Sequence, residues 1–153
     1  MFAKIMSPMT AENLAASVNA IVDLTGAPLD NKHMLTRSGG DDTEARLLAG
    51  KLATFRYRLL ELVGGRKLSP GTNAAHLALQ NAIDAGMEDV LIEIKTACED
   101  YRAKVEAHQT GNPKISRLGK ACARGVDYEY YSLVGTILSC TNNALRTITG
   151  QIA

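Results

Sequence analysis

The side chains of this chain that could do chemistry are few and widely spaced. The three histidines are His33, His76 and His108. None of them stands in an HExxH or HxH arrangement, and none has a cysteine at the spacing that a zinc site needs. The histidines therefore indicate no metal centre, and we expect the protein to need no cofactor.

The cysteines are equally dispersed, at Cys98, Cys122 and Cys140. An odd number of cysteines at these separations fits neither paired CxxC zinc ligands nor a complete set of disulfides. Free thiols in a reducing compartment are the simplest interpretation, so we expect a cytoplasmic protein. No apolar run approaches the ~18 residues of a membrane span, so we expect no membrane partner.

Motifs for catalysis are missing as well. The sequence contains no GxSxG, GxxxxGK[ST] or GxGxxG. The carboxylates Glu99 and Asp100 are adjacent in sequence, so on a helix they point to different sides, which suits solvation better than acid–base work. The sequence therefore favours a non-enzymatic role. The spacing of Phe55, His76 and His108 leaves one other possibility, a haem or small-ligand carrier or enzyme centred on His76.

The composition is that of an ordinary globular domain. The chain has 153 residues, 46% hydrophobic and 22% charged, with 17 basic and 16 acidic residues and a net charge of +1. This length predicts a single domain over residues 1–153, and the near-neutral charge gives no global reason to expect nucleic acid as a partner.

Apolar residues recur at intervals of three and four positions along the whole chain, which is the period of amphipathic helices. We expect helices over about 10–25, 43–63, 73–85, 87–110, 113–124 and 126–148, with a long loop at 27–42 and a flexible start at 1–9. The expected inward stripes include Leu47, Leu48, Leu52 and Leu59 in the second helix and Leu77 and Leu79 in the third. In the last helix one stripe is formed by Tyr130, Val134, Ile137, Thr141, Ala144 and Ile148. Gly86 either breaks or bends the chain. The fold class is therefore an all-α, single-domain bundle of five or six helices.

The C-terminal helix is unusual because residues 132–145 contain no Asp, Glu, Lys or Arg. A surface helix normally has a charged outer side, so we expect nearly the whole circumference of this helix to be covered. It is either the central helix of the bundle or an oligomer interface in which Asn142 and Asn143 set the register. The residues expected at that interface are Tyr130, Tyr131, Val134, Gly135, Leu138, Asn142 and Leu145.

Cations are concentrated in the last third of the chain. They form a stripe on the expected helix at 113–124, which together with the 64–72 loop gives a basic recognition surface of Lys114, Arg117, Lys120, Arg124, Arg66 and Lys67. Such a stripe could track phosphates, although a solvated face is the simpler interpretation. The leading hypothesis is a non-enzymatic association module, either a homo-oligomeric assembly subunit or a protein-binding adaptor. The alternative is a nucleic-acid-associated protein that uses the basic stripe.

Overall fold

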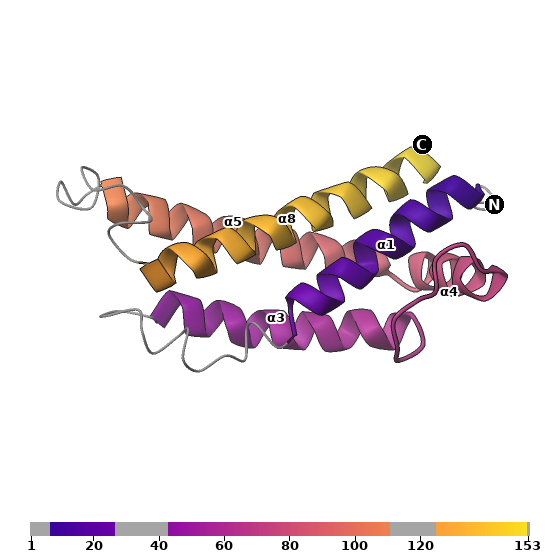
Figure 1. The fold of residues 1–153 in the computed structure, drawn as a ribbon, viewed down its shortest axis with the longest axis horizontal. Coiled ribbons are helices and arrows are strands. Elements are labelled where there is room, and N and C mark those ends of the chain that lie inside the picture. The colour runs from indigo at the N-terminus through magenta and orange to yellow at the C-terminus, as the bar shows by residue number, and fades with distance from the viewer. Residues whose placement is uncertain (1–6, 27–42, 111–124, 153) are drawn as a thin grey trace.

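The structure, a computed structural model, describes residues 7–26, 43–110 and 125–152 of the chain (Figure 1). Its helices are α1 (Pro8–Leu24), α3 (Thr43–Leu62), α4 (Asn73–Asp84), α5 (Met87–Thr110) and α8 (Gly125–Ile152). These residues contain no strand, so the expected all-α bundle is confirmed. The expected loop at 27–42 and the expected helix at 113–124 lie outside the described residues.

The long helices form a four-sided bundle in which neighbours run in opposite directions (Figure 1). Going round the bundle, α1 packs on α8, α8 on α5, α5 on α3, and α3 on α1. The short helix α4 lies at one end, where it contacts α1, α3 and α5. We name each side of the bundle by its two helices, so the α1–α8 side is opposite the α3–α5 side.

The first helix begins earlier than the apolar spacing predicts. Ser7 is its N-cap, with the Ser7 side-chain oxygen accepting a hydrogen bond of 3.1 Å from the Thr10 amide. Pro8 occupies the first turn, where its missing N–H costs nothing. Residues 7–9, expected in a flexible start, therefore belong to the first helix and its cap. The Ser-Pro pair was the signal for this start.

A glycine separates the two helices in the middle of the chain. Thr72 caps α4 by accepting a hydrogen bond of 3.0 Å from the Ala75 amide. Gly86 has φ +109°, a conformation that side chains strongly disfavour, and α5 begins at the next residue. Gly86 therefore breaks the chain into two helices rather than bending one.

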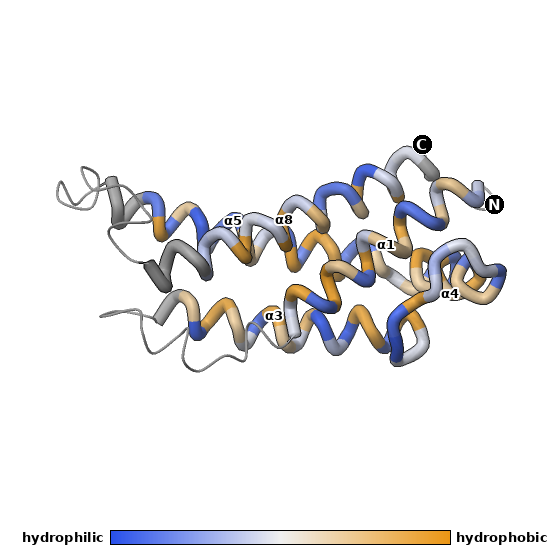
Figure 2. Tube along the Cα trace, viewed as in Figure 1, coloured by the Kyte–Doolittle hydropathy of each residue, from blue (hydrophilic) through white to orange (hydrophobic). Residues whose placement is uncertain are grey.

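The core contains the apolar stripe predicted for the C-terminal helix. Its buried members are Tyr130, Val134, Ile137, Thr141, Ala144 and Ile148. Two leucines expected to face inward do not, because Leu47 is 55% exposed and Leu77 is 62% exposed. Leu48 and Leu79, which were also expected to face inward, are buried. Leu47 and Leu77 lie on other faces of the same helices and are turned away from the core. Figure 2 shows hydrophilic residues along α3 and α5, whereas the part of α8 that follows its grey start is mostly pale or hydrophobic.

Candidate interaction surface around α8

The residues expected at an interface on α8 divide into two groups. Tyr130, Tyr131 and Val134 are buried within their own chain. The Tyr130 hydroxyl donates a 3.1 Å hydrogen bond to the carbonyl of Ala45, and its ring meets the Tyr101 ring edge-on at 5.4 Å between centroids. Burial raises the pKa of Tyr130 above its usual value, so this hydroxyl stays protonated. These residues attach α8 to α3 and α5.

The remaining expected residues, Gly135, Leu138, Asn142 and Leu145, are half-buried. Leu138 and Leu145 pack against the core, as the expectation of a covered helix requires. On the α5–α8 side there is an open hollow of about 660 Å³, lined by Lys95, Glu99, Asn142, Leu145, Arg146 and Thr149. Because its charges are mixed, this hollow has no marked preference for an anion or a cation.

Gly135 is covered by an arginine of its own chain. The Arg102 guanidinium lies 4.5 Å from the centroid of the Tyr131 ring, and Arg102 Nη2 donates a 3.0 Å hydrogen bond to the Tyr131 hydroxyl. That hydroxyl donates in turn to the Glu106 carboxylate. A methyl group added at Gly135 would lie 3.4 Å from Arg102 Nη1. Arg102 therefore occupies the space beside Gly135, a residue that was expected at an interface between chains.

The second asparagine of the expected interface also has a partner in its own chain. Asn143 Nδ2 donates a 2.6 Å hydrogen bond to Ser17 Oγ, and Asn13 Nδ2 donates a 2.9 Å bond to Thr147 Oγ1. These bonds join α1 and α8 at two levels and fix the register between the two antiparallel helices. Asn143 therefore sets register inside the chain, where the sequence had suggested a contact between chains.

Within the single chain the outward side of α8 is open to solvent, so the chain's own helices cover only part of its circumference, and cover by a second molecule stays a prediction. Ser132, Thr136 and Ser139 are exposed. The hydroxyl of Thr136 donates to the carbonyl of Ser132, four residues earlier, at 3.2 Å. Hydroxyl groups used in this way are less available to water, so the outward side of α8 is less polar than its composition suggests.

Helix α1 continues this uncharged surface. Every residue from Asn13 to Val22 on α1, and from Tyr130 to Leu145 on α8, is uncharged. Among the residues exposed on these stretches are Asn13 and Ala16 of α1. Because α1 and α8 pack side by side, the two stretches form one surface to which neither helix contributes an ionised group, bounded by Glu12 and Asp23 on α1 and Arg146 on α8.

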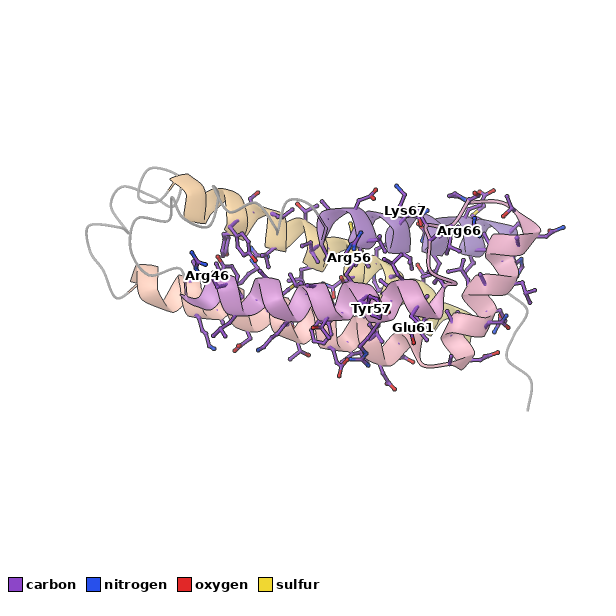
Figure 3. The ribbon with its side chains drawn as sticks, turned by 90° about the horizontal axis from the view of Figure 1, so that it is seen from below. Arg46, Arg56, Tyr57, Glu61, Arg66 and Lys67 are labelled. Carbon is purple, nitrogen blue, oxygen red and sulfur yellow. The ribbon has the colours of Figure 1, made fainter. Side chains whose placement is uncertain are left out.

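The expected basic surface is only partly described. Lys114, Arg117, Lys120 and Arg124 lie outside the described residues. Lys67 Nζ contacts both carboxylate oxygens of Asp23, at 3.1 and 3.2 Å, while Arg66 is exposed (Figure 3). The Asp23 carboxylate therefore offsets the Lys67 charge that was expected to attract an anion. Binding to nucleic acid stays a prediction for the remaining cations.

The groups considered for chemistry lie apart from one another. His76 is half-buried on α4, and Cys98 is buried on α5. Burial raises the pKa of the Cys98 thiol to about 12, and burial also raises the pKa of Cys140. Both groups are free thiols that stay protonated near neutral pH, which suits packing better than nucleophilic attack. Among the described residues, no three His, Cys, Asp or Glu side chains come together as metal ligands.

Within the described part of the chain, every helix is too short or too polar to cross a lipid bilayer. No protein-family model, no curated protein and no solved structure matches this chain.

Proposed function

We propose that this chain is a non-enzymatic association module that binds a second copy of itself through the α1–α8 side. One observation carries the proposal: the exposed surface of two neighbouring helices contains no ionised side chain over residues 13–22 and 130–145. An exposed helix of a globular protein normally has charged residues on its outer side. The centres of protein–protein interfaces, in contrast, are depleted of charged residues.

A second copy is the occupant that suits this surface best. Most homo-oligomers are symmetric, and in a twofold dimer the same surface of each chain meets its copy. An uncharged surface meets itself without repulsion, and the net charge of +1 adds little repulsion between whole chains. Small exposed side chains such as Ala16, Ser132 and Ser139 also allow two helices to approach closely.

Other partners receive less support from the same surface. A nucleic acid would find no cation there to neutralise its phosphates. An adaptor that binds a different protein through this side is the remaining form of the association hypothesis. A reducing, cytoplasmic setting is part of the proposal, because Cys98 and Cys140 are both free.

The test inserts a charge where it harms association and spares the fold. Ser139 is exposed in the middle of the uncharged surface, so Ser139→Glu leaves the core intact. By size-exclusion chromatography with light scattering, we expect the wild type to have at least twice the chain mass of 16.4 kDa, and Ser139→Glu to lower that mass by half or more.

Asn81→Glu is the matched control, because Asn81 is an exposed residue of α4, away from the α1–α8 side. It should keep the wild-type mass. Ser139→Glu with an unchanged mass, or a wild type that stays at 16.4 kDa at high concentration, would contradict the proposal.

A further inference from the structure

The outward side of α3 exposes large apolar residues that the bundle does not use. Tyr57 is 67% exposed and Leu47 is 55% exposed. Together with Gly50, Thr54 and Glu61, they follow one another at intervals of three and four residues, so all five lie on one face of the helix. Figure 3 looks onto α3 and shows Arg46, Tyr57 and Glu61 along it, with Arg56 on the flank nearer to α1. A stripe with this spacing suits packing against another helix.

Charges divide the α3–α5 side lengthwise. Lys51 and Arg58 are exposed on α3, whereas Asp89, Glu93 and Asp100 are exposed on α5. One pair crosses the boundary within the chain, because the Arg58 guanidinium contacts the Glu93 carboxylate. Glu61 on α3 and Lys104 on α5 are exposed on this side as well, so the side is predominantly cationic on α3 and predominantly anionic on α5.

We propose that the α3–α5 side binds the same side of a second copy, about a twofold axis parallel to the helices. Such an axis exchanges the two halves, so the cationic α3 of each chain lies against the anionic α5 of the other. The proposal extends self-association to a second surface and does not depend on the proposed contact through the α1–α8 side.

The pair formed by Arg58 and Glu93 gives the register of this contact. The contact places these two residues near the same level on antiparallel helices, so Lys51, seven residues before Arg58, lies near the level of Asp100, seven residues after Glu93. The twofold axis preserves level, and therefore brings Lys51 opposite Asp100 of the second copy. Asp100 also pairs with Lys104 of its own helix at 3.2 Å, and it can accept from both cations because a carboxylate has two oxygens.

The apolar residues fit the same register. In this register Leu47 is level with Lys104 and Tyr57 with the buried Ile94, and the short exposed side chains nearest to these levels on α5 are Ala103 and Thr96. Short side chains at Ala103 and Thr96 leave room for a large residue from the second copy. The contact would thus cover the leucine and the tyrosine that a single chain exposes.

Charge order decides between a second copy and other partners. A nucleic acid or a uniformly acidic helix would be attracted by α3 but repelled by the carboxylates of α5. A surface that is cationic on one half and anionic on the other is complementary to its own copy under the twofold axis described above. A second copy is therefore the partner whose charges are complementary to both α3 and α5.

The two proposed contacts lie on opposite sides of the bundle, so together they extend an assembly instead of closing it. We expect the wild-type mass to rise with concentration beyond that of a dimer. Lys51→Glu should stop the assembly at the dimer formed through the α1–α8 side. Adding Ser139→Glu should then give the single-chain mass of 16.4 kDa.

A charge exchange makes the test specific to this register. The chain with both Lys51→Glu and Asp100→Lys recreates an opposite-charge pair across the twofold axis, and should regain the wild-type mass. Arg66→Glu is the control, because it reverses an exposed cation outside the α3–α5 side. Tyr57→Ala, at a residue outside the core, should lower the mass without reversing any charge, and circular dichroism checks that each variant is folded.

The outcomes separate the two proposals. One set of results would refute the α1–α8 contact and support the α3–α5 contact. In that set the wild type is a dimer, Ser139→Glu leaves its mass unchanged, and Lys51→Glu lowers the mass to 16.4 kDa. If Lys51→Glu and Tyr57→Ala both keep the wild-type mass, or if the charge exchange does not restore it, the α3–α5 contact is refuted. Loss of mass on Arg66→Glu would also refute it.

Discussion

The α1–α8 side and the α3–α5 side of the bundle are joined in different ways. Neutral hydrogen bonds cross between α1 and α8, where Asn143 binds Ser17 and Asn13 binds Thr147. An exposed ion pair between Arg58 and Glu93 crosses between α3 and α5. Neutral bonds are unaffected by salt, whereas an exposed ion pair is screened by it. The two sides therefore fix the register of their helices with different sensitivities to solution conditions.

The contacts on the two sides also differ in how far they are buried. The Asn143 to Ser17 bond is partly buried, so a change that removes one partner leaves the other without a hydrogen bond and out of water. The Arg58 and Glu93 side chains are about half exposed, at 45% and 46%, and water replaces either partner when the other is removed. We therefore expect single changes on the α1–α8 side to be the more costly.

The largest effect near neutral pH is expected from Asn143→Ala. It removes the amide that donates to Ser17 and leaves the buried Ser17 hydroxyl without that partner. The free energy of unfolding, measured with urea, should fall by about 1–3 kcal/mol. Asn81→Ala, at an exposed residue of α4, is the control and should change it by less than ~0.5 kcal/mol. Equal effects of the two variants would mean that the α1–α8 hydrogen bonds do not stabilise the fold.

The second effect concerns Cys98, which lies in the core that both sides share. Burial raises its pKa to about 12 in the folded protein, whereas the thiol of an unfolded chain titrates near ~8.5. The unfolded chain therefore loses this proton first. The neutral thiol contributes fully to the free energy of unfolding below pH ~8.5. This contribution is lost as the pH rises toward 12, at up to ~1.4 kcal/mol per pH unit.

Cys98→Ala isolates this contribution from other groups that titrate in the same range. The difference in unfolding free energy between the wild type and Cys98→Ala should be constant from pH 6 to ~8 and should shrink above pH ~9. A difference that stays constant up to pH ~11 would show that the thiol is not buried in solution.

A smaller effect is expected on the α3–α5 side. The coupling between Arg58 and Glu93, measured with a double-mutant cycle of Arg58→Ala and Glu93→Ala, should be about 0.2–1 kcal/mol and should decline in concentrated salt. The effect of Asn143→Ala should not depend on salt. A salt-independent ion pair would remove the main difference between the two sides.

The smallest effect is expected from Gly135→Ala. An added methyl group would meet Arg102 Nη1 at an ordinary contact distance of 3.4 Å. Alanine has a higher helix propensity than glycine, so the free energy of unfolding should rise by about 0.5 kcal/mol. Gly135→Leu is the comparison, because a long side chain would displace Arg102 from the Tyr131 ring and should destabilise the protein. Stabilisation by both variants would mean that Arg102 does not cover this position.

The sequence alone predicted the helices and the inner side of α8, because both follow from the spacing of apolar residues. Tyr130, Val134, Ile137 and Ile148 are buried as their spacing indicated. The helical repeat of 3.6 residues determines which residues share a face, and the face with the most large apolar residues packs toward the core. The same argument failed at Leu47, because Leu48 is the neighbour that faces the core.

Contacts between helices could not be predicted in this way. The distance along the chain from Arg102 to Gly135 gives no sign that the guanidinium covers the glycine, and Asn143 could have bound any facing helix. The surface on α3 was missed for a related reason. Its interval pattern was visible in the sequence, but only the packed bundle shows that Leu47 and Tyr57 face away from the core.

The alternating direction of the four long helices has an electrostatic consequence for the two ends of the bundle. Each helix has a partial positive charge of about half a unit at its N-terminus and a matching negative charge at its C-terminus. Because α1 and α5 run one way and α3 and α8 the other, each end of the bundle combines both signs. The backbone fields therefore largely cancel at a distance. Charged side chains on the sides of the bundle must therefore supply any electrostatic preference for a partner.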